Sequence, residues 1–247
     1  FVYIALIMLE KYEDAQTYIA SALERFPDNN ILKFDCIRLF DLVGEPEKAL
    51  GFLDTYFPTY DAMPQAATMK LGLLLQSNRP EEAIAFAAAN PALQEDSAAL
   101  TILYTLYFGT GDYEKAIEVC EKIERLNEKT SEYYATQYFK PLAVSKVYGM
   151  EKAHDQFAKA ADTLRDLCAQ NPGALDLYMY RALCAYQLAE YAEAKRILEY
   201  LIAVAPDEAS FYLAAALVYD ACGDSQEAQE ARQKAQELDP NMVAPLV

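Results

Sequence analysis

The chain has 247 residues, of which 53% are hydrophobic, and its 38 Asp and Glu residues against 21 Lys and Arg residues give a formal net charge of −17. Nucleic-acid binding needs clustered basic residues that displace counterions from phosphates, and the chain has no such cluster, so we expect no nucleic-acid partner. No apolar run reaches the roughly 18 residues of a membrane-spanning helix, so we expect no direct membrane insertion.

Cysteine and histidine usage restricts the compartment and the chemistry. The five cysteines are scattered without a CxxC pair, which predicts free buried thiols in a reducing compartment, the cytoplasm. The single histidine, His154, leaves no set of metal ligands at a recognisable spacing. We therefore expect no metal and no cofactor.

Apolar residues recur at helical spacing along the whole chain, and no stretch shows sustained strand alternation. Short turns with Gly, Asn, Asp or Pro separate the helices, as at Gly44 to Pro46 and at Gly223 to Ser225. The predicted helices form pairs, each with a first helix and a second helix, over residues 1–9 and 12–26, 29–42 and 46–56, 64–77 and 80–89, 97–109 and 113–126, 131–147 and 150–170, 175–188 and 191–204, and 208–222 and 225–238.

A fixed spacing of 34 residues connects these pairs. Pro172, Pro206 and Pro240 are 34 residues apart, and Ala194 and Ala228 each lie 12 residues before a proline. A constant period of this size is the signature of an array of repeated two-helix units that share a continuous core. The spacing therefore predicts an all-α solenoid.

The period is irregular over residues 127–171. Ala153 and Ala194 are seven residues further apart than one period, and seven residues are about two helical turns. We therefore expect the helix over 150–170 to be longer than its neighbours. Pro141 falls inside the preceding helix, where it removes a backbone hydrogen bond and is expected to kink or break that helix about one turn earlier.

These features resemble the tetratricopeptide repeat (TPR) family over nearly the whole chain. Leu71-Gly72 in a first helix, Ala153-x3-Phe157 in a second helix and the spaced closing prolines match the family pattern. The chain departs from that pattern because it has no Trp and because the aromatic residue after Ala-x3 is replaced at Ile19, Leu53, Ala87, Cys120, Leu198 and Arg232. The resemblance implies a right-handed α-solenoid of antiparallel helix pairs, a single domain over 1–239, followed by a tail at 240–247.

The two ends differ in polarity. The helix at 225–238 is polar on one side, as a terminal repeat requires. The helix at 1–9 is apolar on every side and lacks a starting Met, so we expect it to be truncated and to be preceded by further repeats or by another domain.

The resemblance implies that the first helices line a concave groove in which a partner binds. The function predicted is a non-catalytic scaffold that binds a peptide or an amphipathic helix of another protein through apolar side chains. The predicted groove residues are Phe34, Arg38, Met69, Leu73, Thr101, Thr105, Phe108, Tyr138, Leu142, Met179, Leu183, Tyr186, Leu213 and Leu217.

Two alternatives stay open. The chain is an accessory repeat domain of a larger enzyme or chaperone-related protein whose functional domain lies N-terminal to it, or it is a dimerisation module that pairs through its apolar first helix. Within the chain we find no Gly-rich phosphate loop, no metal-ligand spacing and no Ser/His/Asp set, so we expect no enzyme activity. The aromatic cluster from Tyr133 to Phe139 serves either as core or as a contact surface.

Overall fold

The computed structural model describes residues 2–60, 63–126 and 130–239. It consists of two compact units, unit 1 (Phe1–Thr110) and unit 2 (Gly111–Val247), and each is considered by itself. Within the described residues every regular element is helical and no strand occurs, which confirms the all-α class. The predicted tail at 240–247 lies outside the described residues.

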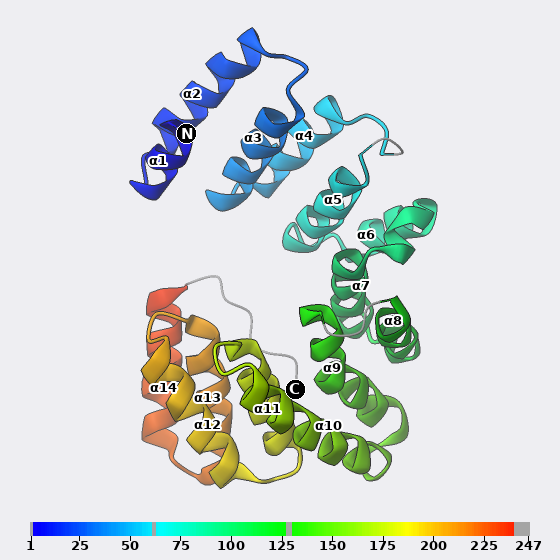
Figure 1. The fold of residues 1–247 in the computed structure, drawn as a ribbon, viewed down its shortest axis with the longest axis vertical. Helices are drawn as coiled ribbons and strands as arrows, with labels where there is room; N and C mark the ends of the chain where they lie inside the picture. Colours follow the sequence, from blue (N-terminus) through cyan, green and yellow to red (C-terminus); the bar gives the residue numbers. More distant parts are fainter. Residues whose placement is uncertain (1, 61–62, 127–129, 240–247) are drawn as a thin grey trace. The chain divides into compact units, whose positions relative to one another are not determined.

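Unit 1 holds three helix pairs and the first helix of a fourth (Figure 1). A short 3-10 helix, η1 (Pro91–Glu95), follows the third pair and was not predicted from the sequence. The α-helices are α1 (Val2–Met8), α2 (Tyr12–Arg25), α3 (Asn30–Leu42), α4 (Pro46–Tyr56), α5 (Pro64–Gln76), α6 (Pro80–Ala89) and α7 (Ser97–Gly109).

Unit 2 begins with the second helix of the fourth pair and adds three further pairs (Figure 1). Its α-helices are α8 (Tyr113–Leu126), α9 (Ser131–Tyr148), α10 (Met150–Gln170), α11 (Leu175–Gln187), α12 (Tyr191–Val204), α13 (Ala209–Cys222) and α14 (Ser225–Leu238). Every observed boundary in the two units lies within one residue of the boundary predicted from the sequence.

Side-chain caps and turn residues explain why the helices begin and end where they do. Asn29 accepts a hydrogen bond from the amide of Leu32 at the start of α3, and Asp96 accepts one from the amide of Ala99 at the start of α7. Gly223 closes α13 at φ +85°, a left-handed conformation that favours glycine. These local signals fix the boundaries independently of the packing.

The alanines that set the period lie at the tightest points of the helix pairs. Each second helix carries one of them near its start, and none of the seven side chains has any exposed surface. A fully buried alanine allows two helices to approach closely, and a larger side chain at that point would have to displace its neighbours. The seven are Ala15, Ala49, Ala83, Ala116, Ala153, Ala194 and Ala228.

The irregular stretch behaves partly as predicted. α10 has 21 residues, against 13 in α11 and 14 in each of α12, α13 and α14, which confirms the predicted extension. α9 continues as one helix of 18 residues through Pro141, so of the predicted kink or break, the break is wrong. Contacts with α8, α10 and α11 hold α9 along its length, and such packing outweighs the loss of one backbone hydrogen bond.

A lysine enclosed by aromatic rings connects α4, α5 and α6. The ammonium of Lys70 lies 2.7 Å from a carboxylate oxygen of Asp54, 5.7 Å from the ring centre of Tyr60 and 5.2 Å from that of Phe86. Burial lowers the pKa of Lys70, but its hydrogen bonds with Asp54 and Tyr60 outweigh burial and raise the pKa above 10.5. The charged lysine therefore contributes stability that is complete below pH 10.5 and is lost as the pH rises through the raised pKa.

Lys70→Met should lower the free energy of unfolding by about 1 kcal/mol, because it removes the ion pair and the cation–π contacts. Urea unfolding at neutral pH measures the change. Lys159→Met, which alters an exposed lysine of α10, is the matched control and should have little effect. An equal loss for the two variants would show that the cluster around Lys70 adds nothing specific.

Candidate functional site

The predicted groove residues of unit 1 divide into accessible and buried side chains. Leu73 is 2% exposed and Phe108 is 8% exposed, so both belong to the core. Arg38 is exposed, and the ring of Phe34 is half-buried and stacked on Phe57 with 4.7 Å between the ring centres. The remaining predicted groove residues of unit 1 are half-buried, and these are Met69, Thr101 and Thr105.

In unit 2, more of the predicted groove residues are buried than in unit 1. Four predicted groove residues are core residues, with exposed fractions of 0% for Tyr138, 1% for Leu142, 9% for Met179 and 4% for Leu183. A partner cannot touch these four side chains unless the helices move apart. Tyr186 on α11 and the pair Leu213 and Leu217 on α13 are half-buried and stay accessible.

Close packing of the first helices explains the burial of Tyr138. α9 contacts α11, and the Tyr138 ring on α9 stacks on Tyr180 of α11 with 6.4 Å between the ring centres. The amide of Gln187 also donates a hydrogen bond of 3.4 Å to the hydroxyl of Tyr138. The side chains of neighbouring first helices therefore fill part of the space that the sequence assigns to a partner.

The aromatic cluster that precedes Pro141 serves two purposes in the fold. Tyr138 is core, and Phe139 packs edge-on against Tyr180 with 5.6 Å between the ring centres. Tyr133 and Tyr134 form an edge-to-face pair with 5.7 Å between the ring centres, and both are half-buried. The first two tyrosines of the cluster thus stay accessible, whereas its last two aromatic residues hold α9 against α11.

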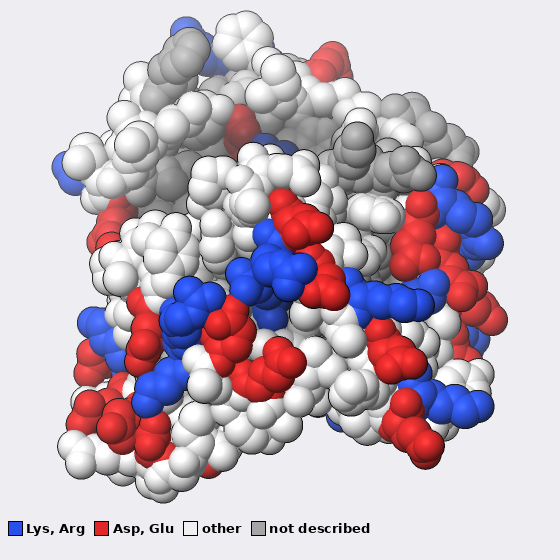
Figure 2. All heavy atoms as spheres, turned by 60° about the horizontal axis from the view of Figure 1, so that its bottom comes forward, with Lys and Arg blue, Asp and Glu red and all other residues white. Residues whose placement is uncertain are grey.

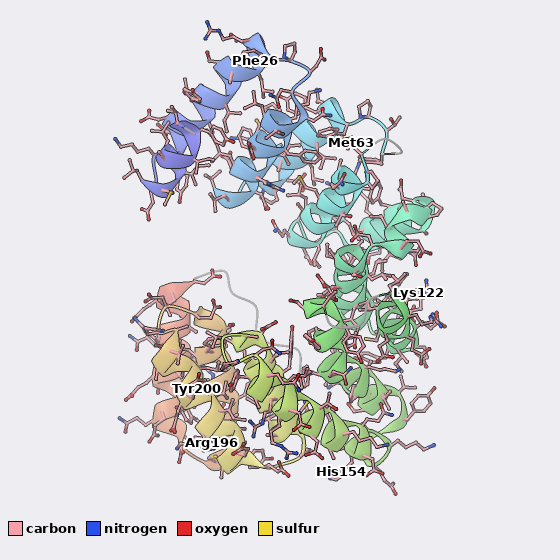
Figure 3. All side chains as sticks on the ribbon, in the orientation of Figure 1. Phe26, Met63, Lys122, His154, Arg196 and Tyr200 are labelled. Atoms are coloured by element: carbon pink, nitrogen blue, oxygen red, sulfur yellow. The ribbon has the colours of Figure 1, made fainter. Side chains whose placement is uncertain are left out.

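The described residues bring together no group of three or more His, Cys, Asp or Glu side chains that could hold a metal ion. His154 lies on α10 with 59% of its side chain exposed, and its nearest carboxylate is that of Asp155 at 3.7 Å (Figure 3). No helix in the described part of the chain has the length and apolarity needed to cross a bilayer.

Basic and acidic side chains are interleaved on the surface. Figure 2 shows Lys and Arg next to Asp and Glu over the face that it displays, without a patch of basic residues alone. Two ion pairs illustrate the pattern in unit 2, where Lys195 lies 2.6 Å from Asp224 and Arg196 lies 2.8 Å from Glu193. Phosphate recognition would need cations that are free of such partners.

The cysteines differ strongly in accessibility. Four are buried, and burial raises the pKa of the Cys36 and Cys168 thiols to about 11 and moves the pKa of the Cys120 and Cys184 thiols in the same direction. Cys222, at the end of α13, is exposed. Since the thiolate is the reactive form, burial and a raised pKa both slow the reaction of the other four.

A disulfide reagent that releases a coloured thiolate on reaction, such as dithiobis(nitrobenzoate), should therefore modify one thiol per folded chain quickly. The remaining four thiols should react only after denaturation. Cys222→Ser should abolish the fast phase. Two or more fast thiols in the folded chain would contradict the burial of the other cysteines.

The arrangement within the helix pairs can be compared with known proteins. The model of the tetratricopeptide repeat family matches residues 105–130 and 209–242, and the second range includes α13 and α14. Comparison with curated proteins finds no matching sequence.

Solved structures share the fold over most of the chain. A tetratricopeptide repeat protein of Parabacteroides merdae is similar at a TM-score of 0.68 and 16% identity, covering 97% of this chain and 91% of that one. A TPR protein of Thermus thermophilus reaches 0.60 at 22% identity, with 72% and 92% covered. The C-terminal part of a TPR repeat-containing protein of Cytophaga hutchinsonii reaches 0.51 at 20% identity, with 98% and 95% covered.

At these identities the structural likeness shows the fold, which is an α-solenoid of antiparallel helix pairs. The match to the family model does not depend on this structural likeness, and its second range, 209–242, contains both the 12-residue spacing from Ala228 to Pro240 and the contacting helices α13 and α14. The chain therefore matches the tetratricopeptide repeat family model over residues 105–130 and 209–242, and its described α-helices share the α-solenoid fold of solved tetratricopeptide repeat proteins.

Proposed function

We propose that the chain is a non-catalytic scaffold that binds a segment of another protein along its first helices. The observation that carries this proposal is the accessible apolar strip of unit 2, which we define as Tyr186, Leu213 and Leu217. Its residues lie on α11 and α13, two first helices that contact each other. Half-exposed leucines one helical turn apart offer a partner apolar surface to bury.

The energetics suit a short segment. A few anchored apolar side chains carry most of the affinity of such interfaces, at about 2 kcal/mol or more each where water is fully excluded. We therefore expect micromolar binding, which corresponds to roughly −8 kcal/mol. Capture of the partner from lysate, followed by an affinity measurement on wild-type and strip-substituted chains, tests the proposal.

Self-association is a second candidate function, favoured by the exposed apolar side of α1. Ile4 is 44% exposed and Met8, one helical turn later, is 81% exposed, while Leu6 and Ile7 on the other side of the helix pack on the core of unit 1. A second copy of the chain could cover the exposed side by pairing α1 with α1. Light scattering should then report a dimer for the wild-type chain and a monomer for Met8→Glu; a monomer in both would remove this candidate.

The broader setting of the chain stays a prediction. We expect a protein or peptide partner rather than a nucleic acid, and a cytoplasmic location. A place as an accessory repeat domain of a larger enzyme or chaperone-related protein is compatible with the same binding role. These points depend on sequence pattern rather than on the geometry of a site.

A further inference from the structure

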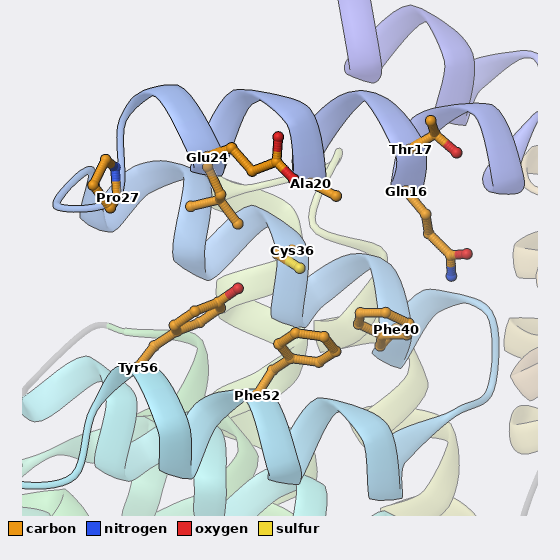
Figure 4. Close-up of a pocket in the computed structure, with 10 residues that line it drawn as sticks. Gln16, Thr17, Ala20, Glu24, Pro27, Cys36, Phe40, Phe52 and Tyr56 are labelled. Atoms are coloured by element: carbon orange, nitrogen blue, oxygen red, sulfur yellow. The ribbon is translucent and has the colours of Figure 1, made fainter.

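Unit 1 contains a crevice between two of its second helices. The crevice lies between α2 and α4, with α3 as its floor, and has a cavity volume of about 600 Å³ (Figure 4). This volume lies within the range of about 300–1,000 Å³ that is usual for binding pockets. We call it the aromatic crevice; its lining residues on α3 and α4 are Cys36, Phe40, Phe52 and Tyr56.

One wall of the aromatic crevice is a row of stacked rings. The centres of the Phe40 and Phe52 rings are 4.9 Å apart with nearly parallel planes, and those of Phe52 and Tyr56 are 5.6 Å apart. All three side chains are half-buried, so they keep accessible surface. Figure 4 shows Phe52 and Tyr56 projecting from α4 toward α2.

The opposite wall leaves room for an occupant. It is a face of α2 on which Gln16, Ala20 and Glu24 follow one another at intervals of one helical turn, with Ala20 at the centre. Phe52 and Tyr56 are also one turn apart on α4. Both walls thus have ridges about 6 Å apart, the spacing with which the ridges of another helix interdigitate.

The hydrogen bonding of the walls favours a helical occupant over an extended one. The backbone groups of α2 and α4 are used within those helices, and the hydroxyl of Thr17 already donates to the carbonyl of Glu13. An extended segment in the crevice would leave most of its own backbone groups without partners, at a cost of about 1–3 kcal/mol for each buried group. A helix satisfies those groups internally.

Charge restricts the occupant further. Of the ten residues that line the aromatic crevice, Glu24 is the charged one. Its carboxylate is exposed and forms no ion pair with the described residues, in a chain whose net charge is −17. A Lys or Arg at the edge of the occupant would complement Glu24, whereas an acidic residue there would be repelled.

The apolar character of this crevice is not a general consequence of the repeat. Unit 2 has a hollow of about 390 Å³ at the corresponding positions of the repeat, between α10 and the pair α11 and α12. There, Arg165 lies 2.9 Å from Asp162 and Arg181 is paired with Glu193, so the charges are already neutralised. The positions that correspond to Ala20, Leu23, Glu24 and Pro27 are Ala158, Ala161, Asp162 and Arg165.

We propose that the aromatic crevice docks an amphipathic helix of a partner protein, with apolar side chains at i, i+4 and i+7 against the rings and a basic residue against Glu24. This site is distinct from the accessible apolar strip of unit 2. It gives the scaffold a second binding surface on its second helices, and either surface can exist without the other.

A labelled helical peptide with leucines at i, i+4 and i+7 and flanking lysines is the probe, and fluorescence anisotropy measures its affinity for the whole chain. We expect a Kd of about 10 μM, or roughly −7 kcal/mol. Ala20→Trp fills the crevice from the exposed surface of α2 and should weaken binding at least about tenfold. Ser21→Trp, at the next position, which is also exposed but lies outside the crevice, is the matched control and should leave the affinity unchanged.

Charge reversal gives a second test that does not depend on how Ala20→Trp folds. Glu24→Lys should lower the affinity for the lysine peptide about tenfold. It should raise the affinity for a second peptide that has glutamates in place of those lysines. Glu118→Lys on α8 changes the net charge equally and should leave both affinities nearly unchanged. Equal effects of the two reversals would contradict a specific role for Glu24.

Three outcomes overturn the proposal. The first is a Kd above about 1 mM for the peptide and the wild-type chain. The second is an equal loss of peptide affinity in the Ala20→Trp and Ser21→Trp variants. The third is self-association of the wild-type chain that Ala20→Trp abolishes, because that result would assign the crevice to a second copy of the chain. The double substitution of Leu213 and Leu217 with glutamate should leave binding of the helical peptide unchanged. The binding role proposed for the crevice and the one proposed for the accessible apolar strip can therefore be rejected independently.

Discussion

Replacing Leu213 and Leu217 together with glutamate should lower the affinity for the captured partner by at least about 100-fold while the chain keeps its helical content. The two leucines are half-buried on α13, so a charged end at either position can reach water at a modest cost to folding. The partner, however, would lose two apolar anchors and would have to bury the new charges. Circular dichroism and an affinity measurement on the same samples check both halves of the prediction.

The matched control is the double substitution of Met179 and Leu183 with glutamate. These side chains are 9% and 4% exposed, and placing two unpaired charges in the core costs several kcal/mol, so unit 2 should unfold. Loss of binding in this variant would then report unfolding rather than a contact. Full binding by the Leu213 and Leu217 variant would move the partner site away from the strip.

Phe157→Ala should lower the free energy of unfolding of unit 2 by about 3–5 kcal/mol, since it opens a cavity in the core. The Phe157 side chain has no exposed surface and lies four residues after Ala153, and its ring centre is 6.1 Å from that of Tyr138. It therefore joins α10 to α9 within the irregular stretch. Hydrogen exchange measured by mass spectrometry should show faster exchange in α9, α10 and α11.

Leu53→Ala is the equivalent change in unit 1, because Leu53 lies four residues after Ala49 and is also fully buried. It should cost about 2–5 kcal/mol and accelerate exchange in α3, α4 and α5. If each variant accelerates exchange mainly in its own unit, the division into two compact units is supported. Equal acceleration over the whole chain in both variants would show that the chain opens as a single cooperative unit.

Local signals account for how well the helices could be predicted from the sequence. Turn residues such as Gly44 and Gly223, and a capping residue such as Asp96, act on the nearest few residues, so their effect can be read directly from the sequence. The 34-residue spacing then predicts which helices form pairs. The spacing is a good guide because its alanines, such as Ala15 and Ala228, are fully buried where two helices meet. Fold class and boundaries follow from interactions within a single repeat.

The accessibility of the groove residues could not be predicted in the same way. Whether Tyr138 or Leu183 faces a partner or the core depends on how closely neighbouring first helices approach, and that distance is set by contacts between repeats, such as the stacking of Tyr138 on Tyr180. The aromatic crevice has the same origin, because it lies between residues of α2 and α4 that belong to different repeats. The pattern of one repeat carries no information on such gaps.

Two places, the helix around Pro141 and the short helix η1, show a second limit of prediction from the sequence. A proline inside a helix predicts a break on local grounds, yet contacts on three sides keep α9 continuous. η1 follows α6 after Asn90, where the sequence predicts only the end of a helix. In both places the packing between elements decides the outcome.

Site-specific photo-crosslinking tests the central claim most directly, because it reports which side chains the partner touches. A benzophenone amino acid placed at Leu217, on first helix α13, should crosslink the captured partner on illumination. The same amino acid at Tyr200, an exposed residue of second helix α12 (Figure 3), should not. Crosslinking from position 200 but not from 217 would contradict binding along the first helices.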